Sequence, residues 1–311
     1  MNLAAIDIGT NSTRLLISSY VNAKFKTLIR EMKITRIGKG IKDTGSISED
    51  QALLTINTLK KYKSLIDKFK VEKYLAAGTS ALRRADNCNE FIKKTFNDTA
   101  IKLEIISGLQ EAAFSFNGAV KSLNLQQKIK IPPKVLVADI GGGSSEFILG
   151  DKYCNVLLIQ SLDIGCVRAS EDYLQSDPPQ KREIMLLNKI IKEKIEEALK
   201  DFKKYEDFII LGLAGTISSL ASISLNLKKY KMEKINYLKL DLKKIKTIFE
   251  NLSNLTLDER KKVTGLESKR ADVILGGIAI VIKVLEYFKK DEIIVSENDI
   301  LDGIIYSLAI F

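Results

Sequence analysis

One short pattern occurs twice in this 311-residue chain, each time between two apolar stretches. The first copy lies within Ala5–Ile17 and the second within Val137–Gly150. The matching residues are Asp7 with Asp139, Ile8 with Ile140, Gly9 with Gly141 and Ser12 with Ser144, at an offset of 139 − 7 = 132 residues. Glycine weakens a strand interior, so each copy predicts a tight turn between two strands. Two copies this far apart predict two similar domains rather than a solenoid.

The composition supports two globular domains and excludes several kinds of catalytic site. Hydrophobic residues make up 45% of the chain and charged residues 28%, which is enough for two cores. The chain has no His, and its cysteines (Cys88, Cys154 and Cys166) lack metal-ligand spacing. A zinc site, a Ser-His-Asp triad and a Cys-His dyad are therefore not expected. The net charge of +10 indicates either an anionic partner or lysine-rich, solvated helix faces.

Strand and helix patterns alternate along the chain, which predicts an α/β architecture. The expected strands are 3–8, 14–20, 24–33, 74–77, 103–106, 135–138, 208–213 and 292–295. The main expected helices follow Ser48, Ser80, Ser107, Pro178 (as an early helical residue) and Thr216, with two more over 268–288 and 300–308. The polar segment 124–133 predicts a boundary between domains 1–124 and 125–311, with the last helix free to pack back on the first domain.

The chain starts directly with a strand pattern and lacks the basic-then-apolar pattern of a signal peptide. The longest apolar run, Val273–Ile282, is too short to cross a bilayer. We therefore expect a cytoplasmic protein without a membrane partner. We also expect no nucleic-acid partner, because no nucleic-acid-binding motif is present.

The chemistry of the repeated turn points to an anion held with a cation. Small residues expose backbone N–H groups and hydroxyls, which together make an anion-binding nest. The predicted phosphate-binding residues of these turns are Gly9, Thr10, Asn11, Ser12, Gly141, Gly142, Gly143 and Ser144. Asp7 and Asp139 lie beside the turns and would repel phosphate unless a cation lay between them. Mg²⁺ with retained waters fits that requirement.

Two acidic and two basic residues complete the predicted site. Ser107 and Gln110 form a capping-box pattern, which places Glu111 in the first helical turn, where the helix dipole favours an ionised carboxylate. Glu146 follows the second turn directly. We expect it to bind the metal or to hold the attacking water, and the alternative is a cross-strand pair with a basic residue. Arg14 and Arg83 border the predicted cleft, and guanidinium groups suit phosphate.

The two turns, Asp7–Arg14 and Asp139–Glu146, resemble the phosphate loops of the actin and sugar-kinase superfamily. Within it, the chain is similar to the Ppx/GppA exopolyphosphatase and guanosine-pentaphosphatase family in its short, two-domain form. The supporting segments are Ala77–Arg83, Ile106–Ala112, Leu162–Arg168, Leu213–Ala221 and Val295–Gly303.

The resemblance implies two actin-like (ribonuclease H-like) domains, each a mixed sheet flanked by helices, with an active-site cleft between them. It implies that Glu111 is the general base, assisted by Glu146, and that Gly215 and Thr216 of a third glycine loop bind phosphate. The implied cofactor is Mg²⁺, held by Asp7, Asp139 and Glu146, with a monovalent cation as a possible activator. The implied substrates are inorganic polyphosphate, guanosine pentaphosphate or both, and guanosine tetraphosphate is a further expected partner. A homodimer is also expected.

The chain departs from the family pattern at three places. Ala113 replaces an arginine, Ala214 replaces the first glycine of Gly-Gly-Thr, and Asp299-Ile300-Leu301 replaces Gly-Leu-Arg. These changes leave two alternatives open beside the hydrolase. One is a non-catalytic sensor that binds an alarmone or polyphosphate, and the other is a kinase or ATPase of the same superfamily.

Overall fold

The computed structural model of the protein describes residues 1–126 and 131–309. The chain forms two compact units: unit 1 comprises Met1–Gly118 and Asn298–Phe311, and unit 2 comprises Ala119–Glu297. The division falls after Gly118, whereas the sequence predicted it after residue 124, and the C-terminal helix belongs to unit 1. The segment predicted as the boundary, 124–133, includes residues 127–130, which lie outside the described residues.

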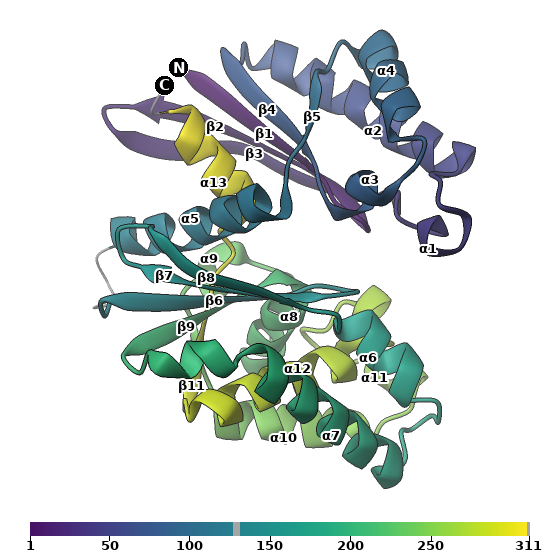
Figure 1. The fold of residues 1–311 in the computed structure, drawn as a ribbon, viewed down its shortest axis with the longest axis vertical. Coiled ribbons are helices and arrows are strands. Elements are labelled where there is room, and N and C mark those ends of the chain that lie inside the picture. The colour runs from purple at the N-terminus through teal and green to yellow at the C-terminus, as the bar shows by residue number, and fades with distance from the viewer. Residues whose placement is uncertain (127–130, 310–311) are drawn as a thin grey trace. The chain divides into compact units, whose positions relative to one another are not determined.

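Unit 1 is built on a mixed five-stranded sheet with the order β3-β2-β1-β4-β5 (Figure 1). Its strands are β1 (Asn2–Ile8), β2 (Ser12–Val21), β3 (Lys24–Ile34), β4 (Lys73–Gly78) and β5 (Leu103–Ile105). Its helices are α1 (Ile41–Thr44), α2 (Glu49–Lys68), α3 (Ser80–Arg84), α4 (Cys88–Thr99), α13 (Ile300–Leu308) and the first part of α5 (Gly108–Gln126). The first three strands form an antiparallel meander, and β1, β4 and β5 run parallel.

The period-two pattern of β1 buries both of its faces. Ala4, Ile6 and Ile8 pack in one cluster with Ile56 and Leu59 of α2. Leu3 and Ala5 pack in another cluster with residues of α13. Successive strand residues point to opposite faces of a sheet, so α2 and α13 cover opposite faces of this one. The C-terminal helix therefore completes the core of unit 1.

Unit 2 is built on a mixed six-stranded sheet with the order β10-β11-β9-β6-β7-β8. Its strands are β6 (Lys134–Ile140), β7 (Ser145–Asp151), β8 (Val156–Leu162), β9 (Phe208–Leu213), β10 (Lys239–Asp241) and β11 (Glu292–Val295). Its helices are α6 (Cys166–Tyr173), α7 (Lys181–Ala198), α8 (Ala214–Ser224), α9 (Met232–Ile235), α10 (Leu242–Ser253), α11 (Leu257–Arg260) and α12 (Ile274–Phe288), with 3₁₀ turns at Lys200–Lys204 and Ser268–Arg270.

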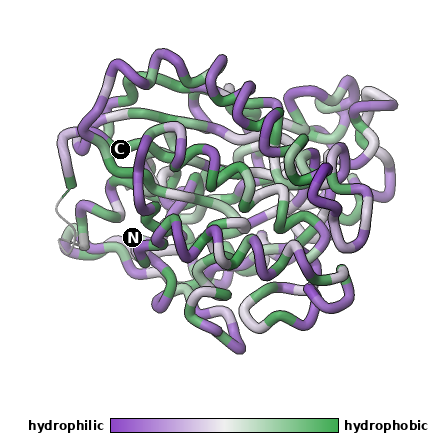
Figure 2. Tube along the Cα trace, turned by 90° about the horizontal axis from the view of Figure 1, so that it is seen from below, coloured by the Kyte–Doolittle hydropathy of each residue, from purple (hydrophilic) through white to green (hydrophobic). Residues whose placement is uncertain are grey.

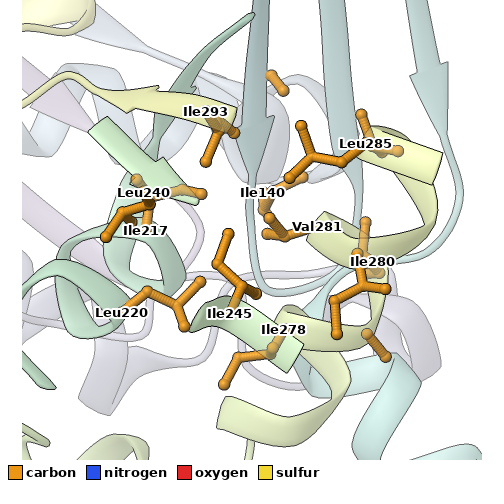
Figure 3. Close-up of a cluster of buried hydrophobic side chains, with 14 of the residues drawn as sticks. Ile140, Ile217, Leu220, Leu240, Ile245, Ile278, Ile280, Val281, Leu285 and Ile293 are labelled. Atoms are coloured by element: carbon orange, nitrogen blue, oxygen red, sulfur yellow. The ribbon is translucent and has the colours of Figure 1, made fainter. Parts of the chain in front are cut away.

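The core of unit 2 forms around α12, whose residues are mostly buried. Figure 3 shows Ile278, Ile280, Val281 and Leu285 of this helix together with Ile140 at the end of β6. Other helices are amphipathic, and Figure 2 shows hydrophilic and hydrophobic stretches alternating along the helical parts of the trace. No helix in the described part of the chain combines the length and the apolarity needed to cross a bilayer.

The predicted mixed sheets flanked by helices are confirmed, and the strands Phe208–Leu213 and Glu292–Val295 have the predicted bounds. Two helix starts were predicted wrongly. The helix after Pro178 begins only at Lys181, because the capping box of Gln180 and Glu183 fixes its start. The predicted 268–288 helix is broken, because 267–273 form i→i+3 bonds and α12 begins at Ile274.

Both sheets repeat one layout, in which an antiparallel meander is followed by parallel strands. In unit 1, β3-β2-β1 is continued by β4 and β5, and in unit 2, β8-β7-β6 is continued by β9 and β11. The repeated turn connects the first two strands of each meander. The internal sequence repeat is therefore a repeat of structure.

Candidate active site

The site residues of unit 1 gather at the carboxyl ends of its parallel strands, where α/β sheets commonly bind ligands. Ile8 of β1 pairs with Gly78 of β4, which in turn pairs with Ile105 of β5. The first turn, the start of α3 and the start of α5 follow these three positions directly. Residues predicted from three separate motifs therefore meet at one edge of the sheet.

The first turn holds its carbonyl oxygens toward the protein. The carbonyl of Asn11 accepts from the amides of Thr35 (3.1 Å) and Arg36 (2.9 Å), and the carbonyl of Thr10 accepts from Gly38 (3.0 Å). Within the described residues, the amides of Thr10 and Asn11 donate to no protein acceptor. Unpaired amides at the tip of a turn are suited to binding an anion.

Asp7 and Arg14 stand opposite each other on β1 and β2 and form an ion pair. Oδ2 of Asp7 accepts from Nε (2.9 Å) and Nη2 (2.6 Å) of Arg14, and Nη1 of Arg14 donates to Asp299. The Asp7 side chain is only 5% exposed. Burial raises the pKa of Asp7, although Arg14 acts in the opposite direction. The predicted metal ligand Asp7 and the predicted phosphate ligand Arg14 thus bind each other.

Glu111 lies in the first turn of α5, and its helix start is the predicted capping box. The Ser107 amide donates to Oε1 of Gln110 (2.9 Å), and the Gln110 amide donates to Oγ of Ser107 (3.2 Å). Oε2 of Glu111 lies 2.8 Å from Nη1 of Arg83. Nη1 of Arg83 also donates to the carbonyl of Ile106 (2.8 Å), which ties α3 to the end of β5. Arg83 is therefore positioned to orient the Glu111 carboxylate.

The second turn, Gly141–Ser144, has the same backbone pattern as the first. A Cβ on Gly9 would lie 3.4 Å from the carbonyl oxygen of Ser12, and one on Gly141 would lie 2.9 Å from that of Ser144. The carbonyls of Gly141 and Gly142 accept from the amides of Cys166 and Val167 at the start of α6 (2.9 Å each). This second turn therefore also directs its carbonyls into the protein.

Gly143 has no structural need to be glycine. A Cβ there would meet no atom within 4 Å, and the residue is not among those with positive φ. In the described part of the chain, the amides of Gly142 and Gly143 donate to no acceptor. Because neither strain nor crowding within the chain requires this glycine, close approach of a ligand is a physical reason for it.

Asp139 and Glu146 stand opposite each other on β6 and β7, at the positions that match Asp7 and Arg14. The sequence left open that Glu146 might pair with a basic residue, but its cross-strand partner is acidic. Oε1 of Glu146 accepts from Oγ of Ser144 (2.6 Å) and Oγ of Ser161 (3.0 Å). Ser161, on β8, was not predicted, because no motif marks the neighbouring strand.

This carboxylate pair fits a magnesium ion. Like charges opposite each other on a sheet repel unless a cation intervenes. Mg²⁺ typically takes one or two carboxylates and completes its shell with water and substrate phosphate. Over residues 1–126 and 131–309, no cluster of three or more acidic or cysteine side chains forms a possible metal site.

The third glycine loop begins α8, directly after β9. A Cβ on Gly215 would lie 1.7 Å from Nη1 of Arg270, so this guanidinium lies against the backbone of the loop. Thr216 is buried (3% exposed). Its side chain packs so closely on Gly277 of α12 that a Cβ there would lie 2.2 Å from Oγ1 of Thr216. The structure thus brings an unpredicted arginine to the loop and places Thr216 in the interior.

The backbone at Ala214 shows why glycine suits this position of the family pattern. Its φ is +71°, in the left-handed region that glycine adopts without penalty and alanine does not. A glycine in the family at this position would relieve that strain. The fold of the loop is kept, because α8 starts at Ala214.

Comparison with known proteins agrees with this geometry. The model of the Ppx/GppA phosphatase family matches residues 16–310. A bifunctional 3-dehydroquinate synthase/phosphatase of Fusobacterium nucleatum is 38% identical over 97% of this chain, which spans 46% of that protein's length. Exopolyphosphatase 2 of Mycobacterium tuberculosis (strain H37Rv) is 32% identical over 99% of this chain and 98% of its own.

A solved structure shows the same fold. The PPX-GPPA enzyme of Aquifex aeolicus has 35% sequence identity and a TM-score of 0.88, over 99% of both chains. The two mixed sheets and their repeated turns thus define an actin-like phosphatase fold. The chain belongs to the Ppx/GppA phosphatase family.

Proposed function

We propose that the protein is a Mg²⁺-dependent phosphohydrolase that releases the terminal orthophosphate of inorganic polyphosphate or of guanosine pentaphosphate. The observation that carries the proposal is the pair Asp139 and Glu146 beside the turn at Gly143. There, two acidic residues opposite each other on neighbouring strands suit a cation, while backbone amides without a protein acceptor and an unhindered glycine suit a phosphate. Family membership supports the same chemistry.

In this proposal, Glu111 is the general base. Its carboxylate accepts a proton from water, the water oxygen attacks the terminal phosphorus, and the bond from that phosphorus to the bridging oxygen breaks. The products are orthophosphate and a substrate one phosphate shorter. Arg83 holds Oε2 of Glu111, which keeps the carboxylate in a fixed position for proton transfer. No covalent intermediate is required.

The remaining roles are binding roles. The amides of Thr10 and Asn11 and those of Gly142 and Gly143 would hold phosphate oxygens. Asp139 and Glu146 would hold the magnesium ion, and Ser144 and Ser161 would orient Glu146. Bound magnesium supplies neutralisation of the charge that develops on phosphate. Asp7 was also predicted as a metal ligand, and its Oδ2 accepts from Arg14, so this proposal assigns the ion to Asp139 and Glu146 first.

The test is orthophosphate release from long-chain polyphosphate, guanosine pentaphosphate and ATP, with and without Mg²⁺. Glu111→Gln should lower kcat by roughly 10²–10⁴, the usual contribution of a positioned base. Glu104→Gln is the matched control, because Glu104 is an exposed glutamate on the neighbouring strand β5.

Three outcomes decide the matter. Release from either of the first two substrates that requires both Mg²⁺ and Glu111 supports the proposal. Activity of Glu111→Gln within threefold of the unmodified protein would remove Glu111 from its role. Binding without any release would favour the sensor, an alternative consistent with the occupation of Arg14 by Asp7 and Asp299.

A further inference from the structure

A short segment of unit 2 carries an unbalanced positive charge. The segment Lys228–Lys234, which we call the lysine segment, runs between α8 and β10 and contains Lys228, Lys229, Lys231 and Lys234, all exposed. Over the described residues, none of these four lysines forms an ion pair. By contrast, Lys189 pairs with Glu193 and Lys192 with Glu196 on α7. The segment also contains the exposed Glu233, so its formal net charge is 4 − 1 = +3. The lysine segment therefore presents a net positive charge at the surface.

Hydrogen bonds connect this segment to the third glycine loop. The hydroxyl of Tyr230, in the middle of the segment, donates to Oε2 of Glu297. Oε1 of Glu297 accepts from Oγ of Ser218 (2.5 Å), and that hydroxyl also lies 3.2 Å from the carbonyl oxygen of Ala214. A continuous chain of polar contacts thus joins the first residue of the loop to the lysine segment, and all of its members belong to unit 2.

The segment is also fixed near both of its ends. The amide of Leu227, just before it, donates to the carbonyl of Ser222 at the end of α8 (3.0 Å). Oδ1 of Asn236, just after it, accepts from the amide of Glu297 (3.0 Å). The side chain of Tyr230 remains 58% exposed even though its hydroxyl is bonded. These anchors hold the lysines in a defined place instead of on a free loop.

We propose that the lysine segment binds the part of a polyanionic substrate that extends beyond the phosphates held at the glycine loops. This inference rests on the proposed function, which places the terminal phosphates of the substrate at the glycine loops. Ammonium groups without ion-pair partners attract successive phosphates through charge alone. They do not distinguish what else is attached to those phosphates. Two sources share this chemistry: the body of an inorganic polyphosphate chain and the 3′-diphosphate of guanosine pentaphosphate. Tripolyphosphate, which has only three phosphates, serves as the short ligand for contrast.

The experiment measures binding in the presence of a chelator, by calorimetric titration over a series of salt concentrations. The variant is Lys228→Gln/Lys229→Gln/Lys231→Gln. The matched control, Lys181→Gln/Lys189→Gln/Lys192→Gln on α7, removes the same charge from exposed positions of the same unit. The ligands are long-chain polyphosphate, guanosine pentaphosphate and tripolyphosphate, and thermal melting checks that both variants fold.

For long-chain polyphosphate, we expect the affinity of the lysine variant to fall at least about tenfold. The slope of log K against log salt should decrease in magnitude by about 2, since each of the three lost phosphate contacts contributes about 0.7 to it. Tripolyphosphate affinity should change less than about twofold, as should long-chain affinity in the control. If the lysine variant also binds guanosine pentaphosphate more weakly, the segment binds the nucleotide as well as polyphosphate. If the affinity for guanosine pentaphosphate is unchanged, the segment binds the inorganic chain.

A second variant separates position from charge. Tyr230→Phe removes the hydroxyl bonded to Glu297 and keeps every lysine, so we expect weaker long-chain binding with an unchanged salt slope. Equal losses in the lysine variant and the α7 control, equal losses for tripolyphosphate, or no binding of long-chain polyphosphate by the unmodified protein would each overturn the inference. Because binding requires no turnover, the inference can fail while phosphate release is observed, and it can hold where release is absent.

Discussion

In unit 1, the aspartate that precedes the repeated turn faces an arginine, whereas in unit 2 the matching aspartate faces a glutamate. The backbones are alike, because Gly9 and Gly141 approach the carbonyl three residues onward in the same way. Arg14 neutralises Asp7 and joins it to Asp299 at the start of α13. Asp139 and Glu146 instead place two negative charges side by side.

The same turn therefore carries a different cross-strand pair in each unit, and we infer a different role for each pair. In unit 1 the cross-strand pair binds the sheet to the C-terminal helix, which completes the core. In unit 2 the cross-strand pair consists of two acidic residues, and the nearby hydroxyls of Ser144 and Ser161 orient one of them. We therefore assign stability to the first pair and chemistry to the second.

The largest expected effect comes from giving unit 2 the arginine that unit 1 has at the matching position. Glu146→Arg should lower phosphate release by about 100-fold or more, because an arginine would pair with Asp139 and remove a proposed ligand. Loss of an outer-shell partner alone typically costs about 10–100-fold. The measurement is a Mg²⁺ titration of orthophosphate release, with Glu146→Gln as the control that removes charge and keeps shape. An unchanged magnesium dependence in Glu146→Arg would refute the proposed metal site.

The matching positions should also differ in their effect on stability. Arg14→Met leaves Asp7 buried without its partner, which should cost about 3 kcal/mol of unfolding free energy, the low end of the range for a broken buried pair. Glu146→Met should cost less than about 1 kcal/mol, because it relieves the repulsion with Asp139.

Urea denaturation of both variants measures this contrast. In the double variant Arg14→Met/Asp7→Asn, part of the lost stability should return, because the unpaired buried charge is removed. Equal losses for Arg14→Met and Glu146→Met would show that the two pairs have the same structural role.

The smallest expected effect concerns pH. Burial raises the pKa of Asp7, with Asp299 acting in the same direction and Arg14 against it. A carboxyl group whose pKa is higher in the folded state binds its proton more tightly there. Its contribution to stability is therefore greatest at low pH and is lost as pH rises from its ordinary pKa through the raised one.

Comparing unfolding free energy against pH for the unmodified protein and Asp7→Asn isolates this group. The unmodified protein should lose up to about 1.4 kcal/mol per pH unit more than the variant within that interval. Burial also raises the pKa of Asp302, which pairs with Arg30 beside Asp299. Both residues are present in the unmodified protein and in the variant, so their effect cancels in the comparison. Parallel curves for the two proteins would contradict the role of Asp7.

Much of the candidate site could be predicted from local sequence. Ser107 and Gln110 specify a helix start through bonds within a few residues, so the position of Glu111 followed from the chain itself. The strands beside each turn followed from their apolar, period-two patterns. The broken helix before α12 was missed, because the i→i+3 bonds of 267–273 leave no periodic signal that distinguishes them from an α-helix.

The repeat, the two turns and the acidic residues beside them could be predicted from the sequence, because they depend on backbone conformation and on spacing along the chain. Only the tertiary structure decided which partner each charge received. Arg14 joins Asp299 across 285 residues, and Arg270 lies on Gly215. Such contacts depend on how strands and helices pack, and no short-range pattern records them.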